Sequence, residues 1–180
     1  MDKIEFDTLS LKVSTEYNIF TAQWVNEKLI EDLILSIDKS GDKHDKKTNV
    51  KALMTDWQMW KTNEPCWKVV ADQVINICKT LRPKGFYENM TPCLTDMWGA
   101  MYLSEEKTIP HDHWPSTWSF CWYLNKPEDS PDLYFPEADY TLPVTKGTMV
   151  FFPGWLRHEV KSKPFKNKRY MIAGNVRLLP

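Results

Sequence analysis

The sequence predicts a mainly β protein with N-terminal helices, arranged as a jelly roll braced by two helices. Two observations favour this class. The period of the apolar residues changes from 3.6 to two near Pro92, and about seven short strand-like runs follow, separated by clusters of Pro, Gly, Asp and Lys. Short strands at this spacing are typical of closed or two-sheet antiparallel structures. The chain shows no repeat or linker, so we expect residues 1–180 to form one domain.

The N-terminal half is expected to supply helical support over residues 20–82. Residues 4–13 alternate loosely and predict a first strand. Apolar residues every three to four positions predict an amphipathic helix over 22–39, with Thr21 as its N-cap. The polar loop after it carries His44 among charged residues, which indicates a surface histidine.

A second helix is expected to follow an irregular covering segment at residues 52–62. Asn63 can cap this helix, Pro65 suits its first turn, and Pro83 ends it. Its apolar residues fall on one face, as expected for a helix packed on a sheet.

The jelly-roll core is expected over residues 92–178. Its first strand begins at Pro92, and the period of two places five residues on one face: Leu94, Asp96, Trp98, Ala100 and Tyr102. The later strands are predicted at about 108–113, 117–125, 131–136, 147–152, 157–161 and 168–178.

Composition and charge indicate an ordinary globular protein. Charged residues make up 26%, apolar residues 42%, and the net charge is −1, so no basic field exists to hold nucleic acid or an anionic membrane. The four cysteines show no CxxC spacing, no apolar run is long enough to span a bilayer, and the N-terminus has no signal pattern. We therefore expect a cytoplasmic protein with reduced thiols. The nine tryptophans are unusual. Five of them lie near the metal site predicted below and could wall a pocket or fill the sheet core: Trp98, Trp114, Trp118, Trp122 and Trp155.

A metal site is predicted around His111-Asp112-His113. On an extended strand both imidazoles share one face, and Asp112 points to the other. His158 follows a buried-looking strand and a Pro-Gly turn, and Arg169 alone in a basic run abuts an apolar strand. Imidazoles suit iron, zinc, copper and nickel, while a guanidinium binds a carboxylate through two parallel hydrogen bonds. The pattern therefore indicates a metal site with an anion clamp.

From about Leu94 to Leu178 the chain resembles the 2-oxoglutarate- and iron(II)-dependent dioxygenases, in particular the prolyl-hydroxylase-like branch of the double-stranded β-helix fold. The resemblance rests on the order and spacing of four segments: 121–125 (CWYLN), 147–153 (GTMVFFP), 158–160 (HEV) and 169–170 (RY). The motif His-x-His-x-x-Ser is especially similar to that of small bacterial and viral oxygenases of this superfamily.

The resemblance implies an enzyme that couples oxidative decarboxylation of 2-oxoglutarate by O2 to hydroxylation of a substrate. It implies that His111 and His158 bind Fe(II), and that Arg169 pairs with the distal carboxylate of 2-oxoglutarate. It also implies that Tyr123, with Tyr102 on the preceding strand, hydrogen-bonds this co-substrate.

The third metal ligand departs from the family pattern, which has Asp or Glu where this chain has His113. An imidazole there leaves the site one unit more positive than a carboxylate does. Asp112 could supply a carboxylate only if a bulge turned the strand. We favour His111, His113 and His158 as the ligands over a set that contains Asp112.

Two other functions stay open from the sequence. One is a three-histidine, cupin-like metalloenzyme that does not use 2-oxoglutarate, and the other is a non-catalytic metal-binding barrel that acts as an interaction module. The prime substrate, whether peptidyl or a small molecule, is not readable, because fold analogy is a poor guide to substrate. The sequence carries no signal for the oligomeric state.

Overall fold

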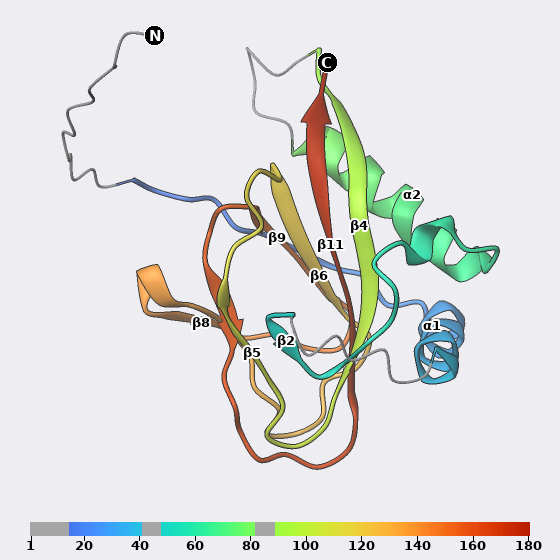
Figure 1. Ribbon diagram of the computed structural model, residues 1–180, viewed down its shortest axis with the longest axis vertical. Helices are drawn as coiled ribbons and strands as arrows, with labels where there is room; N and C mark the ends of the chain where they lie inside the picture. The colour runs from blue at the N-terminus through green and yellow to red at the C-terminus, as the bar shows by residue number, and fades with distance from the viewer. Residues whose placement is uncertain (1–14, 41–47, 82–88) are drawn as a thin grey trace, which may run out of the picture.

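A computed structural model describes residues 15–40, 48–81 and 89–180, and shows two helices and two antiparallel sheets (Figure 1). The larger sheet has the strand order β1-β9-β6-β11-β4-β3, and the smaller has β2-β5-β10-β7-β8. The helices are α1 (Glu27–Lys39) and α2 (Pro65–Thr80), with short 3-10 turns at Met59–Lys61 and Pro136–Ala138. The strands are β1 (Phe20–Gln23), β2 (Val50–Lys51), β3 (Leu53–Met54), β4 (Thr91–Tyr102), β5 (Lys107–His111), β6 (Trp118–Tyr123), β7 (Leu133–Phe135), β8 (Tyr140–Leu142), β9 (Thr148–Pro153), β10 (His158–Val160) and β11 (Arg169–Leu179).

The larger sheet separates two apolar cores, as the alternation along its strands requires. On β4, Met97 and Met101 pack with the helices, whereas Trp98, Ala100 and Tyr102 pack between the two sheets. The same alternation holds on β6, β9 and β11. Both helices therefore cover the outer face of the larger sheet, beside β4 in Figure 1, and leave the inner face to the space between the sheets. This arrangement confirms the predicted jelly roll braced by two helices.

The start of the first helix differs from the prediction. Thr21 is not a cap, because Phe20–Gln23 form strand β1 and pair with β9. The N-cap is Asn26, whose side-chain oxygen accepts a hydrogen bond from the backbone N–H of Leu29 at 3.1 Å. The apolar face of the helix thus begins later than predicted. Val25, which was assigned to it, lies before the helix and is 49% exposed.

Replacing Asn26 by alanine should lower the free energy of unfolding by about 1 kcal/mol, because the first turn of α1 loses the acceptor for an N–H group. The matched control is Thr21→Ala, which removes a hydroxyl from an exposed strand position and should change stability by less than about 0.5 kcal/mol. Urea denaturation of both variants provides the comparison. Equal losses would contradict the capping role of Asn26.

The second helix is close to its prediction. Pro65 is its first residue, but the cap position is Glu64, not Asn63, and no side chain caps it. The buried Trp67 packs toward β4 at Gly99. A Cβ there would overlap the side chain of Ile37 on α1 and come within 3.1 Å of the ring of Trp67, so the glycine allows both helices to approach closely. Neither helix of the described residues is long and apolar enough to cross a membrane.

The strand predictions hold for β4 to β7 and for β9 to β11, and they miss β1, β2, β3 and β8. Strands β2, β3 and β8 were not predicted, since two or three residues are too few to show a period. Leu94 lies on the wrong face in the prediction: a bulge at Thr95 shifts the register, so Leu94 packs on the helix side. The predictions for residues 4–13, His44 and Pro83 lie outside the described residues.

Candidate metal centre

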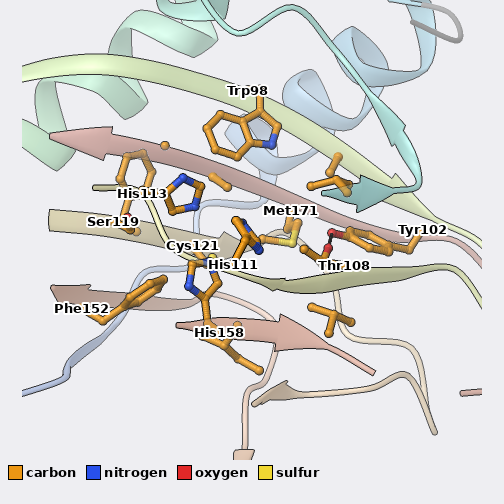
Figure 2. Close-up of a pocket in the computed structure, with 17 residues that line it drawn as sticks. Trp98, Tyr102, Thr108, His111, His113, Ser119, Cys121, Phe152, His158 and Met171 are labelled. Atoms are coloured by element: carbon orange, nitrogen blue, oxygen red, sulfur yellow. Dashed lines mark hydrogen bonds between the residues drawn. The ribbon is translucent and has the colours of Figure 1, made fainter. Parts of the chain in front are cut away.

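Three histidines meet where β5 and β10 pair. His111 ends β5 and lies opposite His158, which begins β10. His113 lies two residues past the strand, not on it as predicted, and its backbone N–H donates to the carbonyl of Gly154 at 2.6 Å. One ring nitrogen from each histidine lies within 4.8 Å of the others, and the imidazoles gather around a common point in Figure 2.

Backbone carbonyls orient two of the three rings. Nδ1 of His111 is 2.8 Å from the carbonyl oxygen of Ile109, and Nδ1 of His158 is 3.0 Å from that of Leu156. A carbonyl can only accept, so each Nδ1 carries the hydrogen and each Nε2 keeps its lone pair. Metal-ligating histidines in proteins are held in this way, by a hydrogen bond from the ring nitrogen that does not bind the metal.

Burial keeps the three imidazoles neutral. It lowers the pKa of His111, lowers that of His113 to about 4 and lowers that of His158 well below the usual range, with the neighbouring imidazoles adding to the effect for His113 and His158. The ring centroids are 4.4 to 5.1 Å apart. Three neutral imidazoles at this spacing offer three nitrogen lone pairs to one cation.

Asp112 lies outside this cluster. Its side chain is exposed, and its carboxylate accepts a hydrogen bond from the backbone N–H of Trp114 at 3.0 Å. The loop that follows is fixed against Gly154, where a Cβ would overlap the backbone of Ser116. This close approach places His113, rather than Asp112, beside the other two imidazoles.

Arg169 begins β11 inside the β-shell and is fully buried. Its guanidinium carbon lies 4.9 Å from the ring centre of Tyr102 and 5.2 Å from that of Tyr123. Its Nε, Nη1 and Nη2 have no hydrogen-bond partner, and neither has the hydroxyl of Tyr123. Buried polar groups are nearly always paired, so these orphaned donors indicate a place for an anion.

The hydroxyl of Tyr102 is already engaged, at 2.7 Å from the hydroxyl of Thr108. Burial raises the pKa of both tyrosines, and it raises the pKa of the neighbouring Cys121 to about 12. All three groups are therefore uncharged at neutral pH, and Arg169 supplies the local charge.

A pocket runs from the histidines to Tyr102 and Thr108, with Trp98 as one wall (Figure 2). Neither Arg169 nor Tyr123 lines it: Arg169 packs against the ring of Tyr102, and Tyr123 packs against Arg169. Only Trp98 of the five tryptophans expected near the site lines this pocket: Trp114 and Trp155 are exposed, while Trp118 and Trp122 pack toward the helices. The alternation along β6 was the sequence signal for Trp118 and Trp122, because it places both side chains on the other face of the strand from Cys121.

Comparison with known proteins places this arrangement in a fold class. A viral collagen prolyl hydroxylase from Paramecium Bursaria Chlorella virus-1, solved with 2OG, superposes with a TM-score of 0.62 and 16% identity over 90% of this chain and 96% of that one. A Pseudomonas putida prolyl-4-hydroxylase gives 0.67 and 18% over 89% and 92%. A Trichoplax adhaerens prolyl hydroxylase, in complex with a hypoxia inducible factor peptide fragment, gives 0.66 and 17% over 89% and 83%.

The chain therefore has the double-stranded β-helix fold of the 2OG-Fe(II) oxygenases, as the sequence resemblance predicted. Identities of 16–18% establish the fold alone. No family model matches the sequence, and neither does a curated protein.

Proposed function

We propose that this protein is an Fe(II)- and 2-oxoglutarate-dependent dioxygenase that hydroxylates a substrate not yet identified. One observation carries the proposal: three neutral imidazoles converge in a pocket that has a buried, unpartnered guanidinium behind its closed end. A buried guanidinium with no partner is costly, so its presence calls for a ligand that pairs with it.

The metal-holding role belongs to His111, His113 and His158. Their donor set fits iron(II), because three nitrogen ligands on one side leave positions open for other ligands. Iron bound with 2-oxoglutarate and O2 supplies oxidative decarboxylation of the oxo acid coupled to hydroxylation of a C–H bond. The protein holds the three ligands, and the walls around Trp98 and Phe152 limit access of water.

The co-substrate role belongs to Arg169 and Tyr123. Their unpaired N–H and O–H groups fit a carboxylate, which accepts from both. Since these atoms have no accessible surface, a neighbouring side chain must move before a carboxylate can reach them. Met171 lies two residues along β11 from Arg169 and lines the pocket, and an unbranched thioether chain can turn aside readily.

The experiment is a direct assay of the full chain loaded with Fe(II). We expect oxygen- and iron-dependent conversion of 2-oxoglutarate to succinate, slow in the absence of prime substrate, and binding of 2-oxoglutarate by calorimetry with Mn(II). The measurements are succinate by mass spectrometry and heat of binding. Absence of both signals would falsify the assignment.

A three-histidine metalloenzyme that ignores 2-oxoglutarate is the second candidate. It is favoured by His113 in place of a carboxylate and by the separation of Arg169 from the pocket. The two candidates differ in what they require of Arg169, since only the dioxygenase needs its guanidinium to bind 2-oxoglutarate.

The substrate class and location are further parts of the proposal. One structural neighbour holds a peptide, which supports a peptidyl substrate as one class beside small molecules. A cytoplasmic location is supported by four unpaired cysteines.

A further inference from the structure

The inner face of the larger sheet carries a cation and a carboxylate at two places along β4 and β11. Along β4 and β11 the paired residues run from Tyr102 and Arg169 at one end of the two strands to Asp96 and Asn175 near their middle. Asn175 lies six residues from Arg169 on β11, which corresponds to about 20 Å of strand. The pocket beside the histidines therefore lies between a buried cation and a carboxylate.

The carboxylate of Asp96 belongs to a polar layer next to the pocket, which it forms with Thr95, Ser119 and Asn175. Ser119, which lines the pocket, donates its hydroxyl to Oδ1 of Asn175 at 2.8 Å. The amide of Asn175 in turn lies 3.5 Å from Oδ2 of Asp96, and the hydroxyl of Thr95 donates to the same oxygen at 3.1 Å. Ser119 and Asn175 are both buried, so they fix the layer and orient Asp96.

Asp96 keeps unused capacity as an acceptor. It forms no ion pair with any residue in the described ranges. Two of its three hydrogen bonds, from Asn175 and Gln58, are 3.5 Å long, at the outer limit for such bonds. Beside it, Oε1 of Gln58 is buried and has no partner. Two acceptor groups without adequate donors indicate a ligand that donates hydrogen bonds.

Aromatic faces lie next to this layer. Trp57 and Trp98 pack with ring centres 4.5 Å apart, and both line an outer groove that leads to His111 and His113. Trp57 is 41% exposed, and its carbonyl accepts from the N–H of Met97, next to Asp96. Tryptophan faces attract cations, and a nearby carboxylate adds to that attraction.

We propose that the prime substrate carries a cationic nitrogen group, an ammonium or a guanidinium, that pairs with Asp96 while an adjacent carbon lies at the histidines. The inference rests on the proposed function, because it takes the three-histidine site as the reaction centre. Trp98 lies between the two groups: its ring centre is 6.1 Å from that of His113, and Asp96 lies two residues, about 7 Å, beyond it along β4. The cationic group and the reacting carbon therefore belong to one flexible chain, as in a lysyl or arginyl side chain.

The test measures binding of blocked amino acids to the full chain by calorimetry, once without metal and once with Mn(II) and 2-oxoglutarate. The probes are the Nα-acetyl N-methylamides of lysine, arginine and norleucine, together with free L-lysine, which separates a peptidyl from a free amino acid source. We expect a cationic probe to bind at least about 10-fold more tightly than the neutral norleucine probe. Asp96→Asn should remove this difference, and Asp96→Glu should restore part of it.

The control is Asp72→Asn, an exposed acid on α2, which should keep the full preference. Folding of each variant is checked by its thermal unfolding, and the preference of the wild-type chain needs no variant at all. Equal binding of charged and neutral probes, binding of neither, or an unchanged preference in a folded Asp96→Asn variant overturns the inference. A failure of Mn(II) and 2-oxoglutarate to bind, with the metal-free preference intact, counts against the proposed function and leaves the cation site standing.

Discussion

Replacing Arg169 by methionine should stabilise the protein and at the same time abolish binding of 2-oxoglutarate. The guanidinium is fully buried with three unpaired nitrogens, and its contacts to the rings of Tyr102 and Tyr123 offset only part of the desolvation cost. We expect a gain of about 2 kcal/mol in the free energy of unfolding without ligand. Loss of two charge-assisted hydrogen bonds should weaken 2-oxoglutarate binding roughly 100-fold or more.

Urea denaturation and calorimetry with Mn(II) provide the two measurements. Arg169→Lys keeps the charge but not the two parallel bonds, so it should weaken 2-oxoglutarate binding without stabilising the chain. Arg177→Met, an exposed position on the same strand, should change stability by less than about 0.5 kcal/mol. If Arg169→Met unfolds more easily and keeps its affinity for 2-oxoglutarate, Arg169 is structural and the metalloenzyme without this co-substrate becomes the better assignment.

The sequence predicted the long strands because each is long enough to show the two-residue alternation of side chains several times. On β4, Met97 and Met101 face the helices, and Trp98 and Ala100 face the space between the sheets. This alternation identifies the two faces of the strand without ambiguity. Leu94 was placed on the wrong face because a bulge adds one residue, which alternation alone does not reveal. The two-residue strands β2 and β3 form by pairing with β5 and β4, which are distant in the sequence, and leave no local signal.

The candidate site was found from His111, His158 and Arg169, but its polar layer was missed. Asp96 and Asn175 meet only because β4 and β11 pair along their whole length, and no motif joins residues 79 positions apart. His113 lies beside the other two imidazoles, but not because of the strand alternation from which this position was predicted. It comes to the site through a loop held by Gly154, not through the period of β5.

Replacing His113 by alanine should remove most of the metal affinity, whereas replacing Asp112 by alanine should leave it unchanged. The ring nitrogen of His113 lies within 4.8 Å of those of the other two histidines, while the carboxylate of Asp112 bonds the backbone of Trp114. We expect His113→Ala to weaken Mn(II) or Co(II) binding more than about 100-fold, because losing only a hydrogen-bond partner of a metal ligand already costs about 10–100-fold. Calorimetry and the visible spectrum of bound Co(II) provide the measurement. A metal affinity that falls in Asp112→Ala but survives in His113→Ala would reverse the ligand assignment.

His113→Asp separates the ligand role of this position from its effect on charge. A carboxylate there keeps a donor at the site, so metal binding should persist, but it lowers the net charge of the loaded site by one unit. The anionic co-substrate should then bind more weakly than to the wild-type site, the opposite of what restoring the usual family ligand would suggest. Binding of 2-oxoglutarate to the Mn(II)-loaded variant measures the difference, and its salt dependence identifies the electrostatic part. Tighter binding in His113→Asp would mean that ligand geometry, rather than the charge of three neutral imidazoles, governs how this site accepts its co-substrate.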